Sequence, residues 1–145
     1  MPDWTALADS LATAGIDIGE AVPRPVGGGD IAAAYRVDGA GTATFLKVMP
    51  VAAADILDAE ADGLSAIAST GAVPTPRVLG FGTSAADAWL ALEWLNMRRL
   101  GETGSAELGR QLAALHGAVG DRHGWHRDNW IGRTPQQNTP TSSWA

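Results

Sequence analysis

A run of three glycines, one lysine and one glutamate are the residues of this sequence whose types and spacing could do chemistry. They are Gly27, Gly28 and Gly29, followed by Lys47 and Glu60. Glycine carries no Cβ, so the backbone N–H groups of such a run can approach the oxygens of a polyphosphate closely. A lysine on the neighbouring strand can add a positive charge to those oxygens. The pattern fits a polyphosphate site, and the alternative, which the glycines taken alone favour, is a β-hairpin with a loose turn and a lysine at a sheet edge.

The residues that follow the glycines predict this hairpin. Two alternating runs, residues 31–37 and 42–48, are separated by the turn sequence Asp-Gly-Ala-Gly at residues 38–41. Asp-Gly and glycine-rich turns between alternating segments are a strong hairpin signal. We therefore expect two antiparallel strands with a flexible loop at their mouth and Lys47 near the end of the second strand.

A helix is predicted over residues 51–70, after Pro50 breaks the strand. Its apolar stripe consists of Leu57, Leu64 and Ile67. Glu60 falls on the same stripe, and a carboxylate there needs a partner because burying an unpaired charge is costly. Lys47 is the nearest candidate in the sequence, and the alternative is a solvated Glu60 at the margin of the stripe. The other acidic residues of the helix, Asp55, Asp58 and Asp62, are expected to face water.

Further segments complete a sheet. Residues 77–82 and 88–95 predict two strands joined by a polar turn, and residues 16–25 look extended, with two prolines that fit an edge strand. The side chains of the strand at 88–95 should alternate, with Trp89, Ala91 and Glu93 on one face and Leu90, Leu92 and Trp94 on the other. A helix over residues 4–14, capped by Asp3, precedes them. The sequence therefore predicts an α+β fold, with a five-stranded antiparallel sheet and one crossing helix.

The remaining third of the chain predicts one helix and a segment without a period. Residues 96–104 read as a polar connector, and residues 105–119 as an amphipathic helix. Residues 120–145 show neither a helical nor a strand period, yet they hold Trp125, Trp130 and Trp144. Side chains of that size favour burial, so we expect this segment to pack against another part of the protein, which could lie beyond Ala145.

The tripeptide His126-Arg127-Asp128 copies the H-R-D of the catalytic loop of protein kinases. That loop also needs an asparagine five residues after the aspartate, and Arg133 stands there instead. We therefore interpret Asp128 and Asn129 as residues that structure the loop, rather than as a catalytic base and a metal ligand.

Composition narrows the function classes. The chain has 145 residues, 46% of them apolar, and a net charge of −6. That charge argues against nucleic acid or an anionic membrane as the main partner. There are no cysteines, hence neither a disulfide framework nor a thiolate metal site. No signal peptide and no apolar stretch of about 18 residues is visible, so we expect a soluble cytoplasmic protein.

In their order, the glycine run, the lysine of the FLKV stretch, the helix glutamate and a strand ending in LEWL resemble the small lobe of a protein-kinase-like fold. More narrowly, the sequence is similar to the fructosamine (ketosamine) kinase family. The most specific part of the resemblance is HGWHRDNWIGRTPQQN at residues 123–138, followed by SSW at residues 142–144. The resemblance covers the whole chain but about half of a family member, so we expect a small lobe over residues 1–96 and a truncated start of the large lobe over residues 97–145.

The resemblance implies roles for particular residues. Gly27, Gly28 and Gly29 match the loop that covers the nucleotide, although GGGD is not the G-x-G-x-x-G of protein kinases. Lys47 matches the lysine that holds the α- and β-phosphates of ATP, and Glu60 matches the helix glutamate that pairs with it. Glu93, Trp94 and Leu95 match the hinge strand, whose backbone would meet the adenine. The family's catalytic aspartate and metal-binding residues lie in an H-G-D-x-x-x-x-N segment and a following aspartate, and neither occurs in this sequence.

The predicted activity is therefore phosphorylation of a sugar hydroxyl on a ketosamine or glycated amine, dependent on ATP and Mg²⁺. The chain alone is expected to bind nucleotide weakly and to be inactive. Two alternatives stay open: a non-catalytic, kinase-like module that docks on a partner, and a phosphotransferase of the aminoglycoside or choline type. Apolar surface left uncovered on the small lobe would favour self-association.

Overall fold

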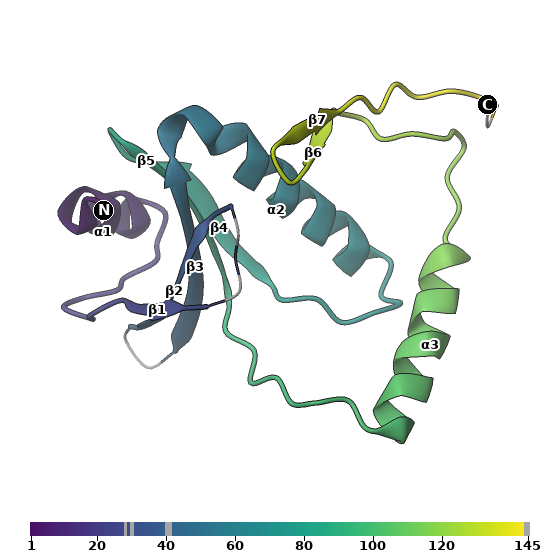
Figure 1. Ribbon diagram of the computed structural model, residues 1–145, viewed down its shortest axis with the longest axis horizontal. Helices are drawn as coiled ribbons and strands as arrows, with labels where there is room; N and C mark the ends of the chain where they lie inside the picture. Colours follow the sequence, from purple (N-terminus) through teal and green to yellow (C-terminus); the bar gives the residue numbers. More distant parts are fainter. Residues whose placement is uncertain (28, 30, 40–41, 144–145) are drawn as a thin grey trace.

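The computed structural model describes residues 1–27, 29, 31–39 and 42–143 (Figure 1). In chain order the elements are α1 (Trp4–Thr13), β1 (Arg24–Val26), β2 (Ala33–Asp38), β3 (Ala43–Pro50), a 3₁₀ turn η1 (Val51–Ala53), α2 (Ala54–Ser69), β4 (Val78–Thr83), β5 (Asp87–Glu93), α3 (Glu102–His116), β6 (Asn129–Ile131) and β7 (Thr134–Gln136). Strands β1 to β5 form one antiparallel sheet in the order β1-β2-β3-β5-β4. The predicted five-stranded sheet is confirmed, and β1 with its proline is an edge strand, as expected.

The sheet lies between α1 on one face and α2 on the other (Figure 1). Side chains of β5 alternate between these two layers, because successive residues of a strand point to opposite faces. Trp89 and Ala91 pack with Leu7 and Leu11 of α1. The side chains that pack with Leu57 of α2 are Met49, Ala88, Leu90 and Leu92. The predicted alternation is thus confirmed, and it gives the domain two apolar cores separated by the sheet.

Helix α1 begins and ends where its sequence predicts. The Asp3 carboxylate accepts hydrogen bonds from the amides of Thr5 and Ala6, at 3.1 and 3.2 Å, and so caps the first turn. At the other end Gly15 takes a φ of 80°, and the amide of the next residue bonds back to the Leu11 carbonyl at 2.9 Å. A residue with a Cβ would be strained in that conformation.

Several boundaries differ from the predictions by a few residues, most clearly those of β3 and α3. Strand β3 includes Pro50, which pairs with Asp87 as the last residue of the ladder, so the break falls one residue later than expected. Helix α3 begins at Glu102 and ends at His116, instead of running from 105 to 119. Its first turn closes with the Ser105 amide on the Gly101 carbonyl at 2.9 Å, which draws residues of the expected connector into the helix. No residue of α3 is buried within the described part of the chain.

The segment after α3, expected to lack regular structure, contains a short hairpin. Strands β6 and β7 pair antiparallel, with Trp130 opposite Pro135, and Gly132 takes a φ of 65° in the turn. Three-residue strands are too short to show an alternating period, which is why the sequence pattern missed them. The hairpin lies beside α2 (Figure 1). The prediction that this segment packs is therefore confirmed for Trp125 and Trp130, which are half-buried, and their partner is a described helix of this chain. Trp144 lies outside the described residues.

No helix of the described residues is both long and apolar enough to cross a membrane.

Candidate functional site

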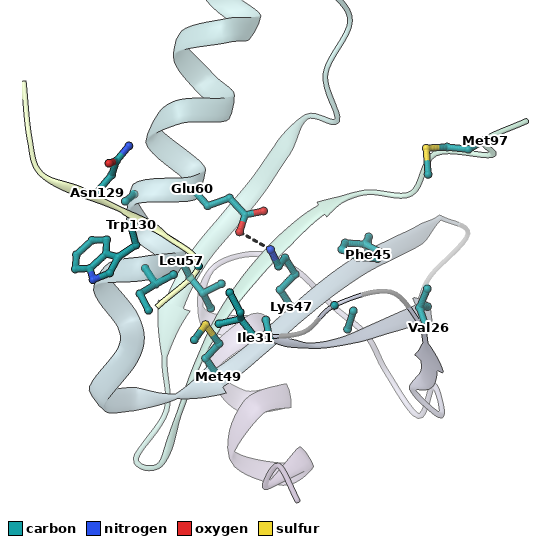
Figure 2. Close-up of a pocket in the computed structure, with 17 residues that line it drawn as sticks. Val26, Ile31, Phe45, Lys47, Met49, Leu57, Glu60, Met97, Asn129 and Trp130 are labelled. Atoms are coloured by element: carbon teal, nitrogen blue, oxygen red, sulfur yellow. Dashed lines mark hydrogen bonds and ion pairs between the residues drawn. The ribbon is translucent and has the colours of Figure 1, made fainter. Parts of the chain in front are cut away.

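A cavity of about 590 Å³ lies between α2 and the face of the sheet that α2 covers. This volume falls within the range of small-molecule sites. Its walls come from the glycine run and strands β1 to β3, from α2, and from the segment that contains β6. Figure 2 shows Lys47 and Glu60 in the middle of the cavity, with Val26 and Met97 toward one end and Asn129 and Trp130 toward the other.

The ammonium of Lys47 forms an ion pair with the Glu60 carboxylate (Figure 2). Lys47 stands in the middle of the sheet, opposite Ala34 on β2 and Leu90 on β5, so its backbone is fixed on both sides. The two side chains are 24% and 34% exposed, respectively. An ammonium has three donors, so the pair with Glu60 leaves donors for a ligand in the cavity. The predicted pair is confirmed, and its role toward a nucleotide stays a prediction.

Lys47 is also the only lysine in the 145-residue sequence. The other nine residues among the ten lysines and arginines of the sequence are all arginines. Reagents that acylate amines therefore report on this one side chain and on the N-terminal amine.

The glycine run forms one wall. Gly27 and Gly29 both line the cavity, and Gly28 lies outside the described residues. A Cβ on Gly29 would stand 2.8 Å from the carbonyl oxygen of Ala32, so the loop cannot take this path with a larger residue there. A Cβ on Gly27 would meet nothing within 4 Å. Glycine at position 27 thus leaves open space in front of the backbone, as close approach by a ligand requires.

The predicted hinge residues lie at the end of β5, and Glu93, Trp94 and Leu95 do not line the cavity. The Glu93 amide bonds to the carbonyl of Arg77 at 2.9 Å, which ties the segment to the chain ahead of β4. Met97, which the sequence did not single out, lines the cavity, and its amide bonds to the Leu95 carbonyl at 3.0 Å. A methionine in a polar connector carries no pattern that would have marked it. The adenine-binding role of the hinge backbone stays a prediction.

Trp94 contacts the cavity wall through a neighbour. Its ring lies 6.2 Å from the ring of Phe45, centroid to centroid, and Phe45 lines the cavity. The Arg36 guanidinium lies 4.7 Å from the centroid of the Trp94 ring, within the range of a cation–π contact. Trp94 therefore packs against Phe45, a residue of the cavity wall.

The segment of residues 123–138 supplies a wall that the sequence did not predict. Asn129, Trp130 and Gly132 line the cavity, and a Cβ on Gly132 would lie 3.5 Å from the Cδ1 of Ile31, just after the glycine run. The tryptophans were the available signal, because they require burial. The sequence could not say against what.

Hydrogen bonds inside this segment confirm that Asp128 and Asn129 structure the loop. Oδ1 of Asp128 accepts from the Asn138 amide at 2.9 Å. The side-chain amide of Asn138 donates to Oδ1 of Asn129 at 2.9 Å and to the Arg127 carbonyl at 3.2 Å. Both residues are thus engaged with the loop itself.

Two aspartates of α2 bind this segment, so the expectation that the helix aspartates face water is confirmed for Asp55, which is exposed, and is wrong for Asp62, whose side chain is 28% exposed. Asp58 is 43% exposed but is also bound. Arg127 donates to Asp58 at 2.6 Å, and the indole N–H of Trp125 donates to Asp62 at 2.8 Å. Nε2 of His126 lies 3.2 Å from the same Asp62 oxygen. The hydrogen bond to Asp58 raises the pKa of Arg127 above its already high ordinary value, and the carboxylates of Asp62 and Asp55 add to this effect.

Comparison with known proteins places the sequence in a family. The family model described as fructosamine kinase matches residues 4–145. This chain belongs to the fructosamine kinase family. It is 37% identical over 144 residues to a "probable ketoamine kinase" of Synechocystis sp., a match that covers 98% of this chain and 49% of that protein. The chain spans about half the length of the curated relatives it matches.

Solved structures agree with this assignment. A "putative fructosamine-3-kinase" from Haemophilus somnus superposes with a TM-score of 0.86 at 25% identity, over 97% of this chain and 48% of that one. A second, from Thermobifida fusca, gives a TM-score of 0.75 at 33% identity, over 90% of this chain and 45% of that one. The fold is thus the α+β, protein-kinase-like fold that the resemblance implied.

Kinases of this fold class use a metal ion with the nucleotide. Among the described residues, no group of three or more histidine, aspartate and glutamate side chains could hold a metal ion. Glu60 is committed to Lys47, while Asp58 and Asp62 are committed to the segment of residues 123–138. We therefore assign no metal ligand to the described chain.

Proposed function

We propose that this chain forms the nucleotide-binding part of an ATP-dependent kinase that phosphorylates a sugar hydroxyl of a ketosamine or glycated amine. The observation that carries the proposal is the Lys47–Glu60 ion pair in a cavity of about 590 Å³ beneath the glycine run. Membership of the fructosamine kinase family supports the substrate class. Residues 1–96 would be the nucleotide-binding lobe, and residues 97–145 would begin a second lobe.

The cavity's two chemistries fit the two parts of ATP. Phe45, Val26 and Met97 offer an apolar end for the adenine, next to the predicted hinge backbone of Glu93, Trp94 and Leu95. Lys47 and the backbone amides of the glycine run would hold the phosphates. Glu60 would hold the Lys47 ammonium in place, so that the positive charge is already positioned before the reaction begins. Bound ATP supplies the phosphoryl group, and Mg²⁺ would accompany its phosphates.

The role of these residues in phosphoryl transfer is positioning and charge neutralisation. The sequence of 145 residues contains no H-G-D-x-x-x-x-N segment, so none of its residues is assigned as the general base. We expect the chain alone to bind nucleotide and not to transfer phosphate to a fructosamine. Because the reaction consumes ATP, we place it in the cytoplasm.

Acylation of Lys47 tests the proposal directly. An amine-reactive ester at mildly alkaline pH acylates the single lysine and the N-terminal amine, and peptide mass spectrometry separates the two. We expect Mg-ATP to slow acylation of Lys47 and to leave that of Met1 unchanged, which serves as the internal reference. Equal rates at Lys47 with and without millimolar Mg-ATP would count against a nucleotide at this site.

A matched pair of variants completes the test. Lys47→Met should abolish the rise in melting temperature that Mg-ATP causes, while circular dichroism shows an intact fold. Arg110→Met is the control, since Arg110 pairs with Glu107 on α3 and does not line the cavity. If Mg-ATP does not raise the melting temperature of the wild-type chain, and light scattering shows a complex with a second protein, the alternative of a non-catalytic binding module replaces the proposed kinase function. If a complete family member carrying this lobe phosphorylates aminoglycosides and not ketosamines, the substrate class is wrong.

A further inference from the structure

Helix α2 is held from two opposite sides. At 3.6 residues per turn, Asp58 and Asp62 lie on one face of the helix, and Glu60 lies about 200° around the helix axis from each of them. Asp58 and Asp62 bind the segment that follows α3, and Glu60 binds Lys47 of the sheet. One turn of the helix is therefore fixed by polar contacts to two different parts of the chain.

Apolar packing fixes the rotation of this helix less firmly. All sixteen residues of α2 are described, and Leu57 alone among them is buried. Leu57 has no exposed surface and packs against Met49, Leu90 and Leu92. Four other apolar side chains of α2 pack against this cluster while only half-buried: Ala54, Ile56, Ala61 and Leu64. One fully buried side chain with half-buried neighbours anchors a helix to a sheet, but such packing resists rotation about the helix axis less than it resists separation from the sheet. The polar contacts on either side of Leu57 are placed to resist that rolling.

The residues that make these polar contacts are close in sequence to residues of the cavity wall. Trp125 and Arg127 bind the helix, and Asn129 and Trp130, which line the cavity, follow within three residues of Arg127. Gly132 then approaches Ile31, two residues after the glycine run. The segment thus connects the outer face of α2 to the flank of the nucleotide loop.

We propose that Trp125 and Arg127 are positioning residues of this site. Their bonds to Asp62 and Asp58 set the rotation of α2 that keeps Glu60 on Lys47, and they hold Asn129, Trp130 and Gly132 of the hairpin against the cavity. The consequence for nucleotide binding rests on the proposed function above. The effect on the ion pair does not, since it can be measured on the chain without nucleotide.

The measurement is the acylation rate of Lys47 in the 145-residue chain with no ligand present. Glu60→Gln sets the upper reference, because it removes the carboxylate that holds the ammonium. We expect Arg127→Met to raise the Lys47 rate at least twofold over wild type, toward the rate of Glu60→Gln. Trp125→Phe, which keeps the ring and removes the N–H donor, should raise it in the same direction. Arg110→Met is the control and should match the wild type.

Rescue separates positioning from a loss of general stability. The exchanged pair Asp58→Arg with Arg127→Asp restores opposite charges at the same contact. We expect this double variant to return the acylation rate of Lys47 to about the wild-type value, whereas each single change should raise that rate. Near-ultraviolet circular dichroism confirms that each variant tested is folded. If a single variant does not fold, the exchanged pair and Trp125→Phe carry the test.

Three outcomes decide the matter. Raised Lys47 rates in Arg127→Met and Trp125→Phe, with rescue by the exchanged pair, support the proposal. Wild-type rates in both folded single variants overturn it, as does an exchanged pair that folds but reacts like Glu60→Gln. Repeating the series with Mg-ATP gives a separate answer: protection of Lys47 absent from the wild type would overturn the proposed function and leave the result on α2 standing.

Discussion

Replacing Gly82 with alanine should test how tightly the α1 side of the sheet is packed. Gly82 on β4 lies directly opposite Trp89 on β5 in the ladder. A Cβ on Gly82 would stand 2.6 Å from Cζ2 and 2.9 Å from Cε2 of the Trp89 ring. Trp89 is only 1% exposed, so neighbouring residues cover the ring and it could move away from an added methyl group only by displacing its own packing and hydrogen bond. Gly82 is therefore the residue that makes room for the largest side chain of this core.

The hydrogen bonds of Trp89 set the magnitude. Its indole N–H donates to the hydroxyl of Ser10 at 2.9 Å, and that hydroxyl donates to the Thr83 carbonyl at 2.8 Å. Overpacking a core by one methyl group costs about 1–3 kcal/mol, and shifting the ring weakens a buried hydrogen bond worth about 1 kcal/mol. We expect Gly82→Ala to lower the free energy of unfolding by about 2–4 kcal/mol. For a chain of this size that corresponds to a fall of roughly 10 °C in melting temperature.

Gly63 provides the matched control. It lies inside α2, and a Cβ there would meet nothing within 4 Å. Gly63→Ala should therefore stabilise the chain by about 0.5–1 kcal/mol, because alanine loses less conformational entropy in a helix. The measurement is the midpoint of urea unfolding with an unchanged m-value. If Gly82→Ala shifted the midpoint no more than Gly63→Ala does, Trp89 would not be fixed against β4 and the reasoning would fail.

Three further changes have expected outcomes. Leu57→Ala removes a fully buried side chain of α2 and should cost about 2–5 kcal/mol by urea unfolding; a cost below about 1 kcal/mol would mean that the α2 core refills the space. Asp3→Ala removes the cap of α1 and should cost about 1 kcal/mol, whereas Asp3→Asn, which retains the acceptor, should cost little. The hydrogen bond from Arg36 holds the pKa of Asp38 below its ordinary value. This contribution to stability is present above the unfolded-state pKa and is lost as pH falls below about 4. In a plot of the urea-unfolding midpoint against pH, Asp38→Asn should therefore reduce the fall of the midpoint at acid pH. An unchanged fall at acid pH would refute the assignment to Asp38.

The parts of the structure that the sequence predicted are those with local signals. Alternation along β5 predicted both cores, because side chains of a strand change face at every residue. Asp3 predicted the start of α1, because its carboxylate caps the amides that follow it within three residues. The place of Glu60 on an apolar stripe predicted its pairing with Lys47, because a half-buried carboxylate needs a cation. Each of these inferences used contacts that are near in sequence or set by a period.

The parts that the sequence missed depend on contacts between distant residues. Asp62 and Trp125 are 63 positions apart, and Asp58 and Arg127 are 69 positions apart. Nothing in the helical period of α2 distinguishes an aspartate that binds a distant arginine from one that faces water. Met97 likewise reaches the cavity through the path of the chain after β5, which no side-chain pattern encodes.

The carboxylates of Asp58 and Glu60 differ in the cation that binds them, whereas Asp62 accepts a hydrogen bond from the indole N–H of Trp125. Arg127 meets Asp58 with a planar guanidinium whose donors suit a carboxylate, and such a pair makes a fixed structural contact. Lys47 meets Glu60 with a compact ammonium, which can share its donors between the carboxylate and a second acceptor. Lys47 is the only lysine of the sequence, and the nine other Lys/Arg positions are all arginine. The one ammonium group, which can bind two acceptors at once, therefore lines the cavity. In our proposals the type of cation, more than the position of the carboxylate on the helix, separates the contact that would position the helix from the contact that would be available to a ligand.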